Sequence, residues 1–308
     1  MRRFYLTPNN LWLISMHSGQ ILDKKQLRAA FERASASYDH AAVLQREISN
    51  RMLGRLEYIK YKPDVILDAG SGTGYGSQQL AKRYPNGQLI AVDIAWTMLS
   101  HARPNTAWCQ RLLPLQQQRS DYVCGDIEQL PFKNASVGLI WSNLALQWCN
   151  DLDRTFAEMH RILRADGLLM FSTFGPDTLK ELRQAFAKID GYNHVNRFVD
   201  MHDIGDLLVN NRFSTPVMDM EYITLTYDDV ISVMRDLKAI GAHNVLQGRQ
   251  QGLMGKNKWQ QVIGEYEKLR RDGKLPATFE VVYGHAWKPF DPRSMLTPET
   301  RRQLGLPP

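Results

Sequence analysis

The sequence has few cysteines and no long apolar run. The three cysteines are too few and too irregularly spaced for a disulfide framework: Cys109, Cys124 and Cys149. No C-x-x-C or H-x-x-x-H pair suggests a metal site. No apolar segment reaches the length of a membrane span, and Pro8-Asn9-Asn10 interrupts the first one before it could act as a signal peptide. We therefore expect a cytoplasmic protein without a metal or a membrane partner.

Acidic residues are scarce toward the C-terminus, which leaves the net charge of +6 unevenly distributed. From Ile231 onward the chain has 13 Lys and Arg but only 7 Asp and Glu. Such a basic region suits an acidic partner, either a protein or a nucleic acid, and a solvated face without a partner is an equal alternative.

One segment, DVILDAGSGTGYG from Asp64 to Gly76, is organised around a buried strand and a glycine turn. Its apolar run ends at Asp68, and Gly70, Gly72 and Gly74 follow at alternate positions, as a tight turn between a strand and a helix requires. A second apolar strand ends in Asp93, at the distance where dinucleotide folds place an acidic residue on the ribose. The segment predicts a site for a nucleoside ligand.

The carboxylate of Asp68 helps to define that ligand. It precedes the first glycine by two residues, where it would repel a phosphate but could accept a hydrogen bond from an ammonium group. An adenosine with a cationic amino-acid tail therefore fits better than a dinucleotide, although another nucleotide-binding α/β domain is the alternative.

Two further strands end in polar residues that belong to the same crevice. Residues 121–125 form the expected third strand, and Asp126 and Ile127 come directly after it. The fourth strand begins at Ser136 and reaches Ser142 and Asn143. Because ligands of open parallel sheets bind at the carboxyl ends of strands, these residues should meet the glycine turn.

The D-A-G-S-G-T-G and V-D motifs resemble the class I S-adenosylmethionine-dependent methyltransferases over residues 65–174. The resemblance implies an α/β fold with a doubly wound, mostly parallel seven-stranded sheet, N-terminal helices and a C-terminal lid. It also implies S-adenosylmethionine as the cofactor and a set of cofactor contacts, with Asp126 and Ile127 on the adenine: Arg33, Asp68, Gly70, Gly72, Gly74, Asp93, Ile94, Met98, Asp126, Ile127 and Asn143.

The expected organisation has five parts. They are an N-terminal extension (1–22), a helical cap (23–62), a cofactor-binding core (63–175), the rest of the sheet with a lid over the substrate (176–290), and a tail (291–308). A Gln-rich insertion at 104–119 interrupts the core, and its role is not evident from its residues.

Longer motifs resemble the malonyl-acyl carrier protein methyltransferases of biotin synthesis from Leu22 to Trp287, among them DIEQLPF, WSNLALQWC and LKAIGAHN. This resemblance implies malonyl-acyl carrier protein as an acidic protein partner, with malonyl-coenzyme A as a second acceptor and no nucleic acid. FGPDTLKELR and LPATFEVVYGHAWKP are also similar to assembly factors of respiratory complex I that modify a protein arginine. That function, or methylation of another small molecule, is the alternative.

The chemistry of carboxyl methylation sets what the substrate site must contain. The acceptor carboxylate has a pKa near that of side-chain carboxyls and is ionised at neutral pH, so no general base is expected. Charge disappears in the transition state, which favours a dry site that aligns the reactants. The candidates for substrate positioning are aromatic wall residues and cations: Tyr38, Trp148, Arg197, Phe198, Lys238 and Arg249.

Overall fold

The computed structural model describes residues 21–103, 120–190, 192, 194–240 and 255–290. Its helices are α1 (Lys24–Ala41), α2 (Val43–Leu56), α3 (Tyr75–Arg83), α4 (Trp96–Ala102), η2 (Leu146–Trp148, a 3-10 turn), α5 (Leu152–Ile162), α6 (Lys180–Ala187), α7 (Met201–Asn210), α8 (Val230–Ala239) and α9 (Lys256–Glu267). Its strands are β1 (Val65–Ala69), β2 (Gln88–Asp93), β3 (Ser120–Cys124), β4 (Val137–Asn143), β5 (Leu163–Phe174), β6 (Ser214–Tyr227) and β7 (Leu275–Trp287).

The seven strands form one sheet in the order β3-β2-β1-β4-β5-β7-β6. Strands β1 to β5 are parallel, whereas β7 runs antiparallel to both of its neighbours, β5 and β6. This mostly parallel sheet confirms the predicted fold class. The switch in strand order lies between β1 and β4, where a crevice for a ligand is expected.

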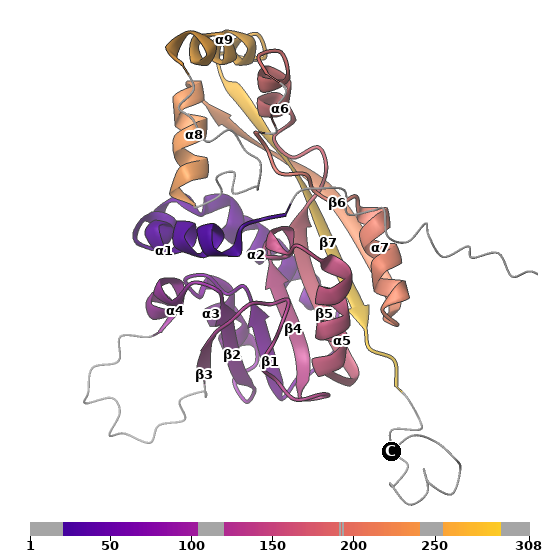
Figure 1. Ribbon diagram of the computed structural model, residues 1–308. Helices are drawn as coiled ribbons and strands as arrows, with labels where there is room; N and C mark the ends of the chain where they lie inside the picture. The colour runs from indigo at the N-terminus through magenta and orange to yellow at the C-terminus, as the bar shows by residue number, and fades with distance from the viewer. Residues whose placement is uncertain (1–20, 104–119, 191, 193, 241–254, 291–308) are drawn as a thin grey trace, which may run out of the picture.

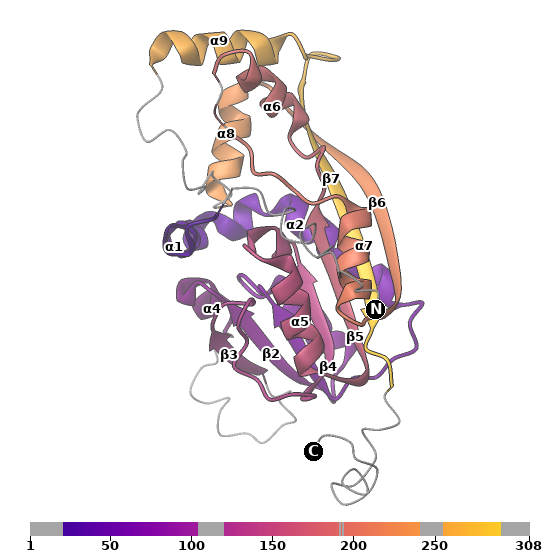
Figure 2. The ribbon, with the colours of Figure 1, turned by 45° about the vertical axis from the view of Figure 1, so that its right-hand side comes forward.

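Side chains of the central strands alternate between two hydrophobic cores, one on each face of the sheet. Ile66 and Leu139 pack with α2 on one face, and Leu67 and Ile140 pack with α5 on the other. Figure 1 and Figure 2 show α5 and α7 on one side of the sheet and α2 on the other. Burial on both faces explains why these strands are continuous apolar runs.

The upper part of the molecule lies beyond the carboxyl ends of the parallel strands. Strands β6 and β7 extend past β1–β4 and carry α6, α8 and α9, while α1 lies across the ends of the parallel strands beside α8 (Figure 1). The N-cap residue of α1 is Asp23, whose carboxylate accepts hydrogen bonds from the backbone N–H groups of Lys25 and Gln26. A ligand at the strand ends would therefore lie beneath α1.

One boundary differs from the sequence expectation. The sequence predicts that the helix before the fifth strand reaches Leu163 and that this strand starts at Leu168, but α5 ends at Ile162 and Leu163 already pairs with Val137. The ladder is irregular here, and Asp166 has a positive φ of 56°. The turn at 165–167 therefore bends the strand instead of separating a helix from it.

The predicted extension, insertion and tail lie outside the described residues, apart from 21 and 22, and the predicted division into parts stays a prediction. Every helix in the described part of the chain is too short or too polar to cross a membrane.

Candidate cofactor and substrate site

The glycine turn between β1 and α3 binds the end of the neighbouring strand. The backbone N–H groups of Gly70 and Ser71 both donate to the carbonyl of Val92, at 2.8 and 2.9 Å. The N–H of Gly72 donates to Oδ2 of Asp93 at 2.9 Å. Gly72 has a φ of 55°, in the left-handed region that favours glycine. The turn is thus shaped by Asp93 as well as by its own glycines.

Asp93 has both carboxylate oxygens in hydrogen bonds with the backbone. Oδ1 accepts from the N–H of Ala95 at 2.8 Å, and Oδ2 accepts from Gly72. Each oxygen has a second lone pair that could accept from a ribose hydroxyl. Burial raises the pKa of Asp93 to about 6, although the N–H groups of Ala95 and Gly72 act in the opposite direction.

Asp68 is buried behind the same turn. Its Oδ2 accepts a hydrogen bond from the Ser77 hydroxyl at 2.6 Å, and burial raises the pKa of its carboxyl to about 7, with the charge of Asp93 adding to the rise. Asp68 lines a small pocket together with Tyr38, Gly70, Gly72 and Asn143. Ionisation of the Asp68 carboxyl costs free energy when no cation is nearby, and an ammonium group in this pocket would stabilise the ionised form.

A narrow pocket of about 90 Å³ continues from there along the strand ends. It contains eight of the predicted cofactor contacts and two of the predicted substrate residues: Gly70, Gly72, Asp93, Ile94, Met98, Asp126, Ile127 and Asn143, with Tyr38 and Trp148. Residues from α1 form its other wall. The structure thus brings together residues from all four predicted strand ends.

A wider cavity of about 830 Å³ lies next to the narrow pocket, under α1, α6 and α8. Four residues line both spaces: Gln147, Trp148, Phe174 and Ile240. Most of the wall of the wider cavity is apolar, and Arg33, Arg235 and Lys238 contribute cations. Within the described residues none of these three cations forms an ion pair. A substrate in this cavity would approach the cofactor past the shared residues.

Some predicted residues occupy other positions. Gly74 lies at the start of α3, where its α-carbon packs against Ala102 and a side chain would collide with that residue. Arg33, predicted to contact the cofactor, lines the wider cavity. Arg197 is exposed and does not line it, although its neighbours Asn196 and Phe198 do.

Arg249 lies outside the described residues. Of the predicted cations, Lys238 and Arg33 are therefore the ones that the structure places at the wider cavity.

Several lining residues were missed by the sequence analysis. Gln45 and Gln147 reach the pocket from α2 and η2, and Lys24, Leu27 and Phe31 reach it from α1. In the wider cavity, the ring of His194 stacks on Phe186 and its Nε2 lies 2.8 Å from Oδ1 of Asp190. Apart from the helical spacing on α1, no local pattern marks these residues.

Comparison with known proteins identifies the family. Residues 67–171 match the family model described as a methyltransferase domain. Malonyl-(acyl-carrier protein) O-methyltransferase of Nitrosospira multiformis is 65% identical over 293 residues, which cover 92% of this chain and 95% of the relative. The chain belongs to the malonyl-(acyl-carrier protein) O-methyltransferase family. The family member from Gallionella capsiferriformans is 61% identical over 87% of this chain and 92% of its own length.

The fold also occurs in proteins that are only distantly similar in sequence. The YcgJ protein of Bacillus subtilis shares it at 16% identity and a TM-score of 0.54, over 79% of this chain and all of the other. The family and the methyltransferase domain confirm an S-adenosylmethionine-dependent methyltransferase, with the cofactor expected from the sequence.

The carboxyl pKa values predict that cofactor binding depends on pH. A ligand with an ammonium group binds the ionised form of Asp68. Because the pKa of this carboxyl is about 7, it is mostly protonated at lower pH and must release a proton when the ligand binds. We expect affinity for S-adenosylmethionine to fall at least tenfold between about pH 7.5 and pH 5.5, as calorimetry would measure. Asp68→Asn should bind weakly at both values and show a smaller change.

Unfolding does not account for this expected loss of affinity. Because folding raises the carboxyl pKa values of Asp68 and Asp93, both groups favour the folded state at low pH and lose that contribution as the pH rises through about 6 to 7. An affinity that stays constant from pH 7.5 to 5.5 would contradict the placement of an ammonium group at Asp68.

Proposed function

We propose that this chain transfers a methyl group from S-adenosylmethionine to the free carboxylate of a malonyl group on acyl carrier protein, a step of biotin synthesis, in the cytoplasm. The relatives' names state this acceptor. The observation that supports it here is the apolar cavity next to the cofactor pocket, whose wall contains cations that form no ion pair with another described residue. These cations suit an acceptor that is itself anionic and is attached to an acidic carrier.

The residues of the chain act by positioning and by excluding water. When bound, the cofactor supplies an electrophilic methyl group on a sulfonium. Trp148 and Phe174 line both spaces and form an apolar wall where the acceptor would meet the methyl group. Phe31 packs edge-on against Trp148, with ring centroids 5.4 Å apart, and fixes that wall. An apolar wall favours a reaction in which a cation and an anion become neutral.

Tyr38 contributes a neutral group beside the cofactor. Burial raises the pKa of its hydroxyl well above the usual range, and the charges of Asp93 and Asp39 act in the same direction. The phenol therefore stays protonated at neutral pH and can donate a hydrogen bond. The acceptor carboxylate is ionised in solution, so no residue needs to remove a proton from it.

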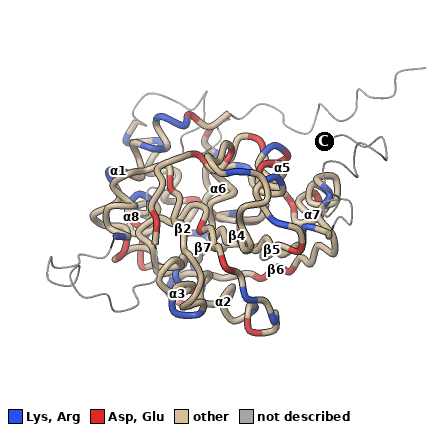
Figure 3. Tube along the Cα trace, turned by 90° about the horizontal axis from the view of Figure 1, so that it is seen from below, with Lys and Arg blue, Asp and Glu red and all other residues tan. Residues whose placement is uncertain are grey.

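Lys238 and Arg33 belong, in this proposal, to the entrance that the acidic carrier meets. They come from α8 and α1, which lie side by side above the strand ends (Figure 1). Elsewhere, positive and negative residues are interspersed along the described chain (Figure 3). Several lysines and arginines after residue 231 are already paired, such as Lys274 with Asp228 and Arg270 with Glu267. Lys238 and Arg33 form no ion pair among the described residues and are therefore better placed to meet an acidic partner than these paired residues are.

Mass spectrometry tests the function directly. The purified chain should methylate malonyl carrier protein once in the presence of S-adenosylmethionine and should accept malonyl-coenzyme A less efficiently. Lys238→Ala should raise KM for the carrier-bound substrate about tenfold, and the difference from the native chain should shrink at high ionic strength.

The matched control for this experiment is Lys256→Ala, because Lys256 is exposed on α9 and does not line the cavity. No methylated carrier, although S-adenosylmethionine binds, would refute the proposed acceptor. Equal effects of Lys238→Ala on carrier and coenzyme A substrates would instead place this lysine next to the malonyl group.

A further inference from the structure

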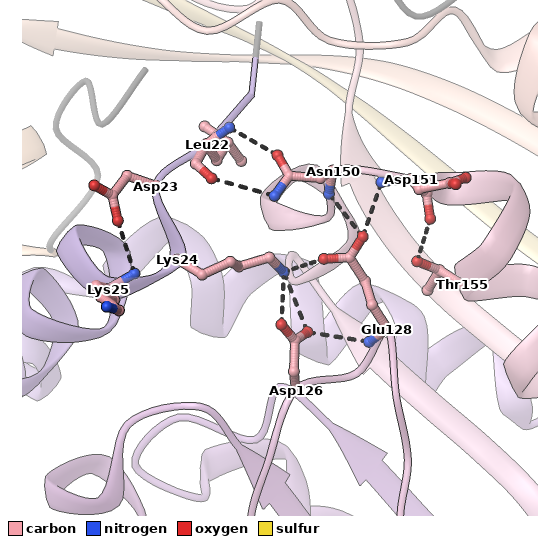
Figure 4. Close-up of polar contacts among 9 residues, drawn as sticks. All are labelled: Leu22, Asp23, Lys24, Lys25, Asp126, Glu128, Asn150, Asp151 and Thr155. Atoms are coloured by element: carbon pink, nitrogen blue, oxygen red, sulfur yellow. Dashed lines mark hydrogen bonds and ion pairs between the residues drawn. The ribbon is translucent and has the colours of Figure 1, made fainter. Parts of the chain in front are cut away.

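The first turn of α1 is attached to the rim of the cofactor pocket by an ion-pair cluster. Nζ of Lys24 lies 3.1 Å from Oδ2 of Asp126 and also pairs closely with Glu128 (Figure 4). Both carboxylates belong to the turn that follows β3. Lys24 and Asp126 also line the narrow pocket, so the ion pair is part of its wall.

A second attachment lies beside the first. The backbone N–H of Leu22 donates to Oδ1 of Asn150 at 2.7 Å, and Nδ2 of Asn150 donates to the carbonyl of Leu22 at 3.2 Å. Oε1 of Glu128 accepts from the backbone N–H groups of Asn150 and Asp151, at 3.0 and 2.8 Å. Figure 4 shows the two attachments as one connected network. We call this network the clasp: Leu22, Lys24, Asp126, Glu128 and Asn150.

The clasp lies at one end of the wall that α1 forms. Lys24, Leu27, Phe31 and Tyr38 line the pocket from one face of this helix, at spacings of three, four and seven residues. The opposite wall consists of strand ends, including Asp93 of β2. A nucleoside between these walls is partly covered by α1, so a movement of α1 away from the strand ends would ease its exchange.

Different forces hold the middle and the start of α1. Ala34 near its middle packs in an apolar cluster with Ala95 and Met98. At its start the polar clasp acts together with a small apolar cluster of Leu22 and Leu27. Partly buried ion pairs are screened by salt less than exposed ones but can separate without exposing much apolar surface. The start of α1 is therefore the end that can open first.

The charge balance of the clasp leaves Asp126 able to bind a ligand as well. One lysine faces two carboxylates, so the cluster keeps one negative charge. Asp126 Oδ1 already accepts from the Glu128 N–H at 3.1 Å, which fixes the orientation of the carboxylate. A neutral donor, such as the exocyclic amine of an adenine, can share Asp126 with Lys24 without creating an unpaired cation.

We propose that Lys24 is a positioning residue that holds α1 closed over the bound cofactor and keeps Asp126 oriented toward the base, so that the clasp sets the rate of cofactor release. This inference rests on the cofactor assignment but not on the identity of the methyl acceptor. Lys24 does not touch the reacting atoms in this proposal.

The test measures release of the demethylated product, S-adenosylhomocysteine, by stopped-flow fluorescence, which requires no acceptor. Lys24→Met removes the cation, so Asp126 and Glu128 repel each other, and release should become at least tenfold faster. Lys24→Arg retains the cation and should restore a rate close to that of the native chain. Asn150→Ala breaks the second attachment and should also accelerate release.

Lys25→Met is the matched control because Lys25 is exposed in the same turn, and its backbone N–H rather than its side chain bonds to Asp23. It should release the product at the native rate. Higher ionic strength should accelerate release from the native chain but not from Lys24→Met, in which salt only screens the repulsion between Asp126 and Glu128. A purely structural lysine would not produce this difference.

Two results would overturn the inference. One is a native release rate in both Lys24→Met and Asn150→Ala. The other is a lower melting temperature in Lys24→Met with an unchanged release rate, which would show that the clasp stabilises the fold but does not control release of the cofactor. Loss of activity on malonyl carrier protein would leave these rates unaffected, so a failure of the proposed acceptor can be recognised separately.

Discussion

Replacing Asp93 by Ala is expected to weaken S-adenosylmethionine binding between about tenfold and a hundredfold, because hydrogen bonds to a charged group contribute roughly 1.5 to 3 kcal/mol. The substitution removes the acceptor that we assign to the ribose and leaves the N–H groups of Gly72 and Ala95 without the Asp93 carboxylate as their partner. The glycine turn loses its shape as well as its ligand contact. Titration calorimetry measures the affinity, and circular dichroism checks that the chain still folds.

Asp93→Asn is the informative control for this result. It retains one carbonyl oxygen and the size of the side chain but has no charge, so its affinity should lie between those of the native chain and Asp93→Ala. Affinities of both variants equal to that of the native chain would contradict the assignment of the narrow pocket to the cofactor.

Replacing Gly284 by Ala is expected to prevent folding or to destabilise the chain by about 3 kcal/mol, because overpacking a filled core forces strained side chains and backbone shifts. A Cβ atom at Gly284 in β7 would lie 2.2 Å from the end of the Phe171 ring. Phe171 is fully buried, and its ring is tilted against that of Phe156 with the centroids 5.8 Å apart, so a shift of the ring would disturb the core around it. Chemical denaturation measures the loss.

Two further variants make this prediction specific. Phe171→Leu in the Gly284→Ala background removes the colliding ring atoms and should recover part of the stability. Gly264→Ala places the same methyl group on α9, where no described atom outside the helix's own backbone and the two neighbouring residues lies within 4 Å of it. It should stabilise the chain by about 0.5 to 1 kcal/mol because alanine is the better helix former. A Gly284→Ala chain of native stability would show that the Phe171 ring moves freely.

The cofactor half of the site could be predicted because its signals are local. Gly70, Gly72 and Asp93 lie within one strand-turn-helix-strand unit, and the ends of parallel strands meet at one edge of a sheet regardless of the details of packing. The predicted strand ends at Asp126 and Asn143 follow from the same rule. The structure places all five at the narrow pocket.

Contacts between segments far apart in the chain, and the lining of the wider cavity, could not be predicted in the same way. Lys24 and Asp126 meet at the narrow pocket but are 102 residues apart, and nothing in either segment indicates the other. The direction of a side chain in a loop is also undetermined by sequence: Arg197 is exposed, whereas the residues on either side of it line the cavity. The antiparallel insertion of β7 between β5 and β6 likewise depends on long-range pairing that no local pattern contains.

The position of β7 has a consequence for synthesis of the chain on the ribosome. In the described sheet β6 pairs with β7 alone, and the outer edge of β5 is covered by the same strand. About 100 residues separate Phe174, the end of β5, from Leu275, the start of β7. At ordinary translation speeds the nascent chain therefore spends roughly 5 to 20 seconds with the β5 edge unpaired. A ribosome that stalls before residue 275 would leave an exposed strand edge open to pairing with other chains.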